Sequence, residues 1–164
     1  MKRRGLIGAS VLAASNALMR PVLAQSADAT LSLVERFAAT LTAHDMSGFA
    51  TLFADDYQNH QASAAAPATP SGLSQKQATV NFFAARLTGM PDLKVSIEVA
   101  VPAADKVAAS FVYTGTHGGT YFGIAPTGKA LRFTSCDIFA VRDGTFVEHW
   151  GMGDIAGILA QLKS

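Results

Sequence analysis

The chain has 164 residues, of which 49% are hydrophobic and 15% carry a charged side chain, and its formal net charge is +1. A charge this small, with no run of Lys or Arg after residue 4, argues against a nucleic-acid partner and against a lipid-surface patch. Typical soluble domains contain about 25% charged residues, so we expect part of the surface to be covered by a partner, most simply in a homodimer.

The first residues have the pattern of an export signal. Residues 2–4 are basic, residues 5–18 are apolar, and residues 22–24 are small or apolar, as at a signal-peptidase site. The apolar stretch is shorter than the roughly 20 residues of a membrane span, so no stable membrane insertion is expected. We expect residues 1–24 to be removed, residues 25–164 to form a single domain, and the protein to be periplasmic or secreted.

The export route is left open by this leader. Arg3-Arg4 followed by Leu6-Ile7 resembles a twin-arginine signal, and an ordinary Sec signal is the alternative.

Cys136 is the only cysteine, so no intrachain disulfide can form in an oxidising compartment, and stability must come from packing or association.

Three helices are expected in the first half of the chain, because apolar residues recur there at helical spacing. The apolar stripes are Leu33, Val34, Phe37 and Leu41 in the first helix, Met46, Phe49, Leu52 and Phe53 in the second, and Val80, Phe83 and Leu87 in the third. Ser74 and Gln77 have the spacing of a capping box that opens the third helix.

The second half of the chain alternates between apolar and polar residues, which is typical of strands. Alternating or strand-like runs cover residues 95–101, 107–113, 131–141 and 146–150, and residues 155–162 have the pattern of a short C-terminal helix. This order predicts an α+β fold in which a cone-shaped, curved antiparallel sheet packs against three N-terminal helices and leaves an apolar pocket.

Residues 62–72 are rich in Ala, Pro and Ser and show no apolar period, which predicts an exposed loop over the mouth of the pocket. A lid that closes over the substrate and a plain connector are both consistent with this composition.

Asp137 is the most informative residue, because it lies in an otherwise apolar strand where an isolated buried carboxylate is costly. The length of the following turn decides what it faces. A three-residue loop at 143–145 places Asp137 opposite Gly151 with His149 on the same face, whereas a two-residue Asp-Gly turn places Trp150 opposite the acid. We expect the first register.

Several segments together resemble the SnoaL-like polyketide cyclases and ester cyclases, which belong to the nuclear transport factor 2 fold superfamily. The segments are residues 115–119, 122–129, 137–139, 143–144, 148–150 and 159–162. The resemblance extends over roughly residues 30–162 and implies cofactor-free acid/base chemistry, although the same fold hosts many activities.

The resemblance also implies site residues. In the aldol-type cyclases of this family, the acid/base carboxylate lies at the position of Gly151, and a nearby histidine lies at the position of Asp137. The usual acid is therefore absent, and Asp137 is expected to supply a carboxylate from the facing strand. His117 and Asn81 fall at positions that are polar and line the cavity in those cyclases.

Three residues are expected to take part in catalysis. Asp137 is the expected general base or acid, with a structural carboxylate tied to His149 or Ser135 as the alternative. His149 either orients Asp137 or acts as the base itself. His117 is expected at the pocket mouth, where it would polarise a substrate carbonyl.

Other polar and aromatic residues are expected to contact a ligand or to have structural roles. The steroid isomerases of the same superfamily have their general base near the position of Asn59, but an amide cannot accept a proton, so that mechanism is not expected. Asn59 and His60 would bind a ligand carbonyl or cap the second helix, and the aromatic residues would stack on a planar ligand or belong to the core. The expected ligand-binding residues are Tyr57, Asn59, His60, Asn81, Tyr113, Phe139 and Trp150.

No metal and no cofactor are expected, because the four histidines are scattered and no i, i+4 pair is present. Two functions follow. The first is acid/base ring closure or isomerisation of a small apolar, carbonyl-containing molecule. The alternative is a non-catalytic periplasmic module that binds a small molecule, which Gly151 at the usual acid position favours.

Overall fold

The computed structural model describes residues 26–61 and 69–164, which form helices on one face of a five-stranded sheet. The predicted leader, residues 1–24, lies outside the described residues, as do residues 62–68 of the predicted loop. The elements are α1 (Ala27–Thr42), α2 (Met46–Ala50), β1 (Phe53–Asn59), α3 (Gln75–Gly89), β2 (Lys94–Pro102), β3 (Lys106–Thr116), β4 (Ala130–Arg142), β5 (Thr145–Gly153) and α4 (Ile155–Lys163).

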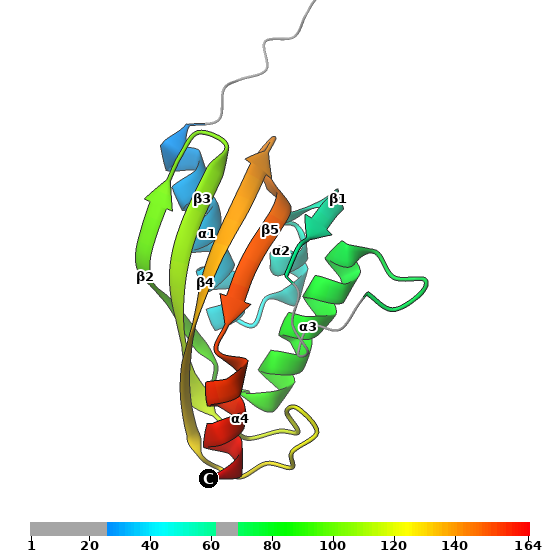
Figure 1. Ribbon diagram of the computed structural model, residues 1–164, viewed down its shortest axis with the longest axis vertical. Coiled ribbons are helices and arrows are strands. Elements are labelled where there is room, and N and C mark those ends of the chain that lie inside the picture. Colours follow the sequence, from blue (N-terminus) through cyan, green and yellow to red (C-terminus); the bar gives the residue numbers. More distant parts are fainter. Residues whose placement is uncertain (1–25, 62–68) are drawn as a thin grey trace, which may run out of the picture.

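The strands lie in the order β1-β5-β4-β3-β2, and every neighbouring pair is antiparallel except β1 and β5, which are parallel. Figure 1 shows the long strands curving together, with α1 and α2 behind the sheet, α3 beside β1, and α4 at the end where β4 begins. The predicted α+β class, with a curved sheet against three helices and a short final helix, is confirmed.

The third helix begins where its capping box predicts. The Ser74 side chain accepts a hydrogen bond from the Gln77 backbone N–H at 3.1 Å, and the Gln77 side chain accepts one from the Ser74 backbone N–H at 2.9 Å. Such a cap typically contributes about 1 kcal/mol to helix stability. It fixes the start of the helix that later supplies one wall of the cavity.

The prediction for residues 46–53 is wrong in part. The helix α2 ends at Ala50, and Phe53 opens the strand β1, which pairs in parallel with β5. The pairing joins segments about 90 residues apart along the chain, for example Asn59 with His149. Local periodicity carries no signal of such a pairing, so β1 was not expected.

The β4–β5 hairpin has the predicted register, but not for the predicted reason. The turn contains two residues, Asp143 and Gly144, and both have positive φ, 51° and 75°. Beyond the turn, Val141 pairs with Phe146 but Ala140 pairs with Glu148, so the strand carries one extra residue, a β-bulge. The extra residue shifts the pairing by one position and places Asp137 opposite Gly151.

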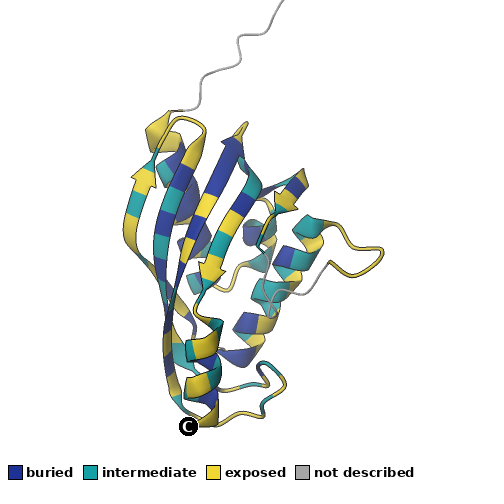
Figure 2. Ribbon diagram, viewed as in Figure 1, coloured by how far each residue is buried: buried dark blue, intermediate teal, exposed yellow. Residues whose placement is uncertain are grey.

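The core lies between α1 and the concave face of the sheet. Phe37 of α1 is buried, with ring centroids 4.9 Å from Phe111, 5.1 Å from Phe49 and 5.3 Å from Phe83. Figure 2 shows buried residues alternating with less buried ones along β3 and along most of β4, as expected for a sheet with one covered face. The side chains at odd-numbered positions 133 to 139 of β4 face inward, and Asp137 is among them.

Candidate active site

A cavity of about 770 Å³ opens between α3 and the concave face of the sheet. Seven Phe and Tyr side chains line it beside polar ones, and Thr69, Pro70 and Leu73 are also part of the lining. Three side chains in its lining belong to ionisable acids or bases other than tyrosine, namely Arg86, Asp137 and His149. An apolar cavity with few convergent polar groups is the usual form of a small-molecule site.

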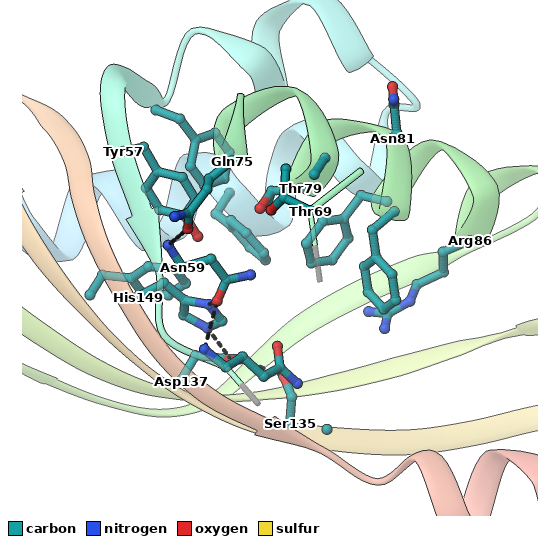
Figure 3. Close-up of a pocket in the computed structure, with 18 of the residues that line it drawn as sticks. Tyr57, Asn59, Thr69, Gln75, Thr79, Asn81, Arg86, Ser135, Asp137 and His149 are labelled. Carbon is teal, nitrogen blue, oxygen red and sulfur yellow. Dashed lines mark hydrogen bonds and ion pairs between the residues drawn. The ribbon is translucent and has the colours of Figure 1, made fainter. Parts of the chain in front are cut away.

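Asp137 and His149 lie in direct contact in this cavity. The distance from Asp137 Oδ1 to His149 Nε2 is 2.8 Å, and each residue is only 8% exposed. The two strands bring them together because Asp137 pairs with Gly151, and His149 lies two positions before Gly151 on the same face. The predicted acid–imidazole pair is therefore present (Figure 3).

Asn59 fixes the proton on the other nitrogen of His149. The Asn59 Oδ1 atom accepts a hydrogen bond from the Gln61 backbone N–H at 3.0 Å, so this atom is the amide oxygen. The same oxygen lies 3.0 Å from His149 Nδ1, and an oxygen without a hydrogen can only accept. Nδ1 therefore carries a proton, and one further proton is shared between Nε2 and Asp137.

Ser135 holds the second oxygen of the acid. It lies two residues before Asp137 on the same face of β4, and its hydroxyl donates to Asp137 Oδ2 at 2.6 Å. The hydroxyl of Tyr113 lies 3.4 Å from the Ser135 oxygen. Asp137 is thus bound through both oxygens, which satisfies a buried carboxylate and fixes its rotamer.

Gly151 is required by the space that Asp137 and His149 occupy. A Cβ atom at position 151 would overlap both Asp137 Oδ1 and His149 Nε2. Gly151 has no positive φ, so the requirement is steric and not conformational. The family resemblance implied an acid at position 151, and in the structure the carboxylate of Asp137 on the neighbouring strand occupies the space of a side chain there.

Aromatic rings form the walls around this pair. The Phe139 ring stacks on His149 with centroids 4.8 Å apart, and Tyr113 stacks on Phe133 at 5.0 Å. Burial raises the pKa of Tyr113 to about 12 and raises the pKa of Tyr57 as well. The Thr79 side chain lies beside the buried Tyr57 hydroxyl and offsets part of the rise in its pKa. Both phenols are therefore neutral hydrogen-bond donors at physiological pH.

Arg86 is the site residue that the sequence reasoning missed. Its guanidinium lies within the cavity lining, is 4% exposed, and is surrounded by aromatic rings of α3, β3 and β4. The sequence did contain a sign of this role, because Arg86 lies three residues after Phe83 on α3. This spacing puts a cation on the helical face that was expected to be apolar.

His117 does not lie where the sequence reasoning placed it. It is fully buried, is not part of the cavity lining, and contacts Thr127 through Nδ1 at 2.9 Å to the hydroxyl and 3.2 Å to the backbone nitrogen. Thr116, the neighbour of His117, pairs with Ala130, whereas Asp137 pairs with Ala109. The two pairs are seven residues apart along β3, and each residue of a strand adds about 3.3 Å. His117 thus organises the loop between β3 and β4, at the far end of the sheet from Asp137.

Two predicted ligand-binding residues lie on the other face of the sheet. Trp150 alternates with His149 and is exposed, and the His60 ring stacks on it with centroids 4.8 Å apart. His60 also pairs with Glu148 at 2.8 Å. Neither residue lines the cavity, because side chains of adjacent strand residues point to opposite faces.

The remaining predicted ligand-binding residues are distributed around the cavity. Tyr57, Asn59, Tyr113 and Phe139 line it. Asn81 borders it from α3 but is exposed, and Figure 3 shows its amide pointing away from Asp137 and His149.

The described residues include no group of three or more His, Cys, Asp and Glu side chains placed to hold a metal ion. Within the same ranges, no helix is long and apolar enough to span a membrane.

A family model described as SnoaL-like polyketide cyclase matches residues 32–162. No functionally curated protein matches the chain. Among solved structures, IdmH from Streptomyces antibioticus, a proposed polyketide cyclase, is 26% identical with a TM-score of 0.70, over 82% of this chain and 99% of IdmH. AclR from Streptomyces galilaeus, a proposed hydroxylase, is 23% identical with a TM-score of 0.72, over 84% of this chain and 83% of AclR.

Proposed function

Because the chain belongs to the SnoaL-like polyketide cyclase family, we propose that it catalyses ring closure or isomerisation of a small apolar, carbonyl-containing substrate by acid/base chemistry. The observation that carries the proposal is the Asp137–His149 pair, which holds one shared proton in an aromatic cavity. A buried acid and base in contact are the groups that such a reaction needs.

In the proposed reaction, the carboxylate of Asp137 removes a proton from the carbon beside a substrate carbonyl and leaves an enolate. The enolate carbon attacks a second carbonyl carbon of the same substrate, and a C–C bond forms. The new alkoxide takes the proton back from Asp137, so no atom is lost and no oxidant is needed. A substrate that isomerises takes the proton back at another carbon instead.

The neighbouring side chains support each step. His149 and Asp137 share one proton, so the proton taken from carbon leaves the pair with one positive charge, which stabilises the enolate. Asn59 and Ser135 hold the two groups in place, so little reorganisation is required when charge develops. The aromatic side chains of the lining supply apolar surface against which a flexible substrate folds into a compact shape.

The test is deuterium incorporation at the α-carbon of an aromatic β-keto ester, followed by proton NMR in heavy water. We expect the wild-type protein to accelerate exchange above the buffer rate in a saturable manner. Saturable binding of the ester with no accelerated exchange would contradict the proposal and support a non-catalytic binding module, the alternative that Gly151 suggested.

We also propose that the protein is exported and works as a homodimer. Export is supported by the pattern of residues 1–24. Dimerisation is supported by the outer face of the sheet, where Ile138 and Trp150 form one exposed cross-strand pair and Cys136 and Met152 form the next. Mass spectrometry of periplasmic protein would test both points, since it reports the mature N-terminus and the native mass.

A further inference from the structure

Arg86 is a buried cation on which an acidic side chain, Asp137, acts through space and without a direct ion pair. Its side chain is 4% exposed, and no carboxylate of the described residues lies within ion-pair distance of it. Buried charges are normally paired, because an isolated charge in an apolar environment is strongly unfavourable. A ligand that brings the missing negative charge would satisfy this requirement.

The contacts of Arg86 leave most of its hydrogen-bond donors free. The rings of Tyr113, Phe83, Phe82 and Phe133 lie 4.5, 4.9, 5.1 and 5.1 Å from the guanidinium carbon, and these contacts involve ring faces. Nε donates a hydrogen bond to the Tyr121 hydroxyl at 3.2 Å, and the Tyr113 hydroxyl is a second hydrogen-bond partner of the guanidinium. The remaining N–H groups of the guanidinium are available to a ligand.

The charge of the cavity as a whole is also positive. The lining contains three charged or acid/base side chains other than tyrosine: Arg86, Asp137 and His149. Asp137 and His149 share one proton beyond the one on Nδ1, so the pair is neutral whichever partner holds it. The single charge of Arg86 therefore remains, and it attracts an anion.

We propose that Arg86 binds a carboxylate on the substrate, which makes the substrate an aromatic acid that also carries the reacting carbonyl group, and not an uncharged molecule. A guanidinium donates two parallel hydrogen bonds to a carboxylate, and the surrounding rings accept a flat apolar body. Figure 3 shows Arg86 at the opposite side of the view from Asn59 and His149. Binding at Arg86 thus holds the substrate carboxylate away from the acid of the pair, and the reacting carbonyl at the other end of the substrate lies near Asp137.

The inference rests on the proposed function for the identity of the site, but its test measures binding alone. The probes are 2-naphthoate and 2-naphthamide, which have the same shape and differ in charge, titrated calorimetrically into the wild type, Arg86→Met and Arg36→Met. Arg36 is an exposed residue of α1 outside the cavity, so Arg36→Met is the matched control.

We expect the wild type and Arg36→Met to bind naphthoate at least about tenfold more tightly than naphthamide, as for an ion-paired hydrogen bond worth about 1.4 kcal/mol or more. The preference should disappear in Arg86→Met. No naphthoate binding by the wild type, equal affinity for the two probes, or a preference that survives in folded Arg86→Met would overturn the inference. If Arg86→Met does not fold, Arg86→Lys replaces it and should weaken the preference, since lysine lacks the planar fork.

A further variant separates this inference from the proposed function. Asp137→Asn should lose the deuterium exchange and keep the preference for naphthoate. Loss of the preference in folded Asp137→Asn would show that the acid, and not Arg86, controls ligand charge, and would overturn the inference. Absence of exchange in the wild type together with a retained preference would overturn only the proposed function.

Discussion

The carboxylate of Asp137 occupies the space that a side chain at Gly151 would need on the adjacent strand. The resemblance to the cyclases implied an acid at position 151. Here a carboxylate of the paired strand occupies that space, and His149 fills the remainder and contacts Asp137.

Gly151→Ala should therefore inactivate the protein. The added methyl group overlaps Asp137 Oδ1 and His149 Nε2, and a displacement of about 1 Å in a catalytic group lowers rates about 100-fold. The rate of deuterium exchange measures the effect. Gly153→Ala is the control, because a Cβ there meets only Ile155 Cδ1 at 3.8 Å. Equal rates in the two variants would refute the steric account.

The proton on His149 Nδ1 is a second testable feature. Long-range proton–nitrogen NMR should show Nδ1 of His149 protonated in the wild type, because Asn59 Oδ1 can only accept. Asn59→Ala removes this acceptor, so the tautomer should no longer be fixed and the exchange rate should fall about tenfold. Asn81→Ala, at the cavity border, is the control. A wild-type spectrum with unprotonated Nδ1 would contradict the assignment.

The buried tyrosines predict how stability depends on alkaline pH. The pKa of Tyr113 is raised by burial from 10.0 to about 12, so the unfolded chain releases this proton before the folded chain does. The contribution to stability is therefore complete below pH 10 and is lost as the pH rises from 10 towards 12. Absorbance at 295 nm should show this late ionisation, and Tyr113→Phe should remove it. Ionisation of Tyr113 near pH 10 in the folded protein would contradict a buried hydroxyl at this position.

The outer face of the sheet predicts the oligomeric state. Met152 is 78% exposed and lies beside Cys136, Ile138 and Trp150. Met152→Asp places a charge in this apolar area and should convert a dimer to a monomer in native mass spectrometry. Ala39→Asp changes an exposed position of α1 and should leave the mass of the dimer unchanged. A monomeric wild type would exclude the proposed assembly.

The hairpin shows how far sequence reasoning could reach. The apolar alternation of β4 correctly identified the face of Asp137, because burial enforces a period of two. The register was also right, yet it arises from a two-residue turn followed by a bulge, and not from the expected three-residue loop. A two-residue turn followed by one bulged residue pairs Asp137 with the same residue as a three-residue loop does. The sequence pattern alone therefore could not distinguish the two arrangements of the hairpin.

Other parts of the site depend on distant pairings that leave no local signal. Asn59 reaches His149 only because β1 adds to the sheet in parallel, and the residues after Ala50 were expected to continue a helix. His117 was placed at the pocket mouth by resemblance, whereas strand lengths put it at the other end of the sheet. Arg86 was overlooked because a lone cation on an apolar helical face was not considered as a ligand contact.

The central claim is that Asp137 transfers the substrate proton, and Asp137→Asn tests it most directly. Asparagine has the same shape but cannot accept a proton, so deuterium incorporation into the β-keto ester should fall at least about 100-fold. Asp143→Asn, in the exposed turn of the same hairpin, should keep the wild-type rate. Full exchange activity in folded Asp137→Asn would contradict the account.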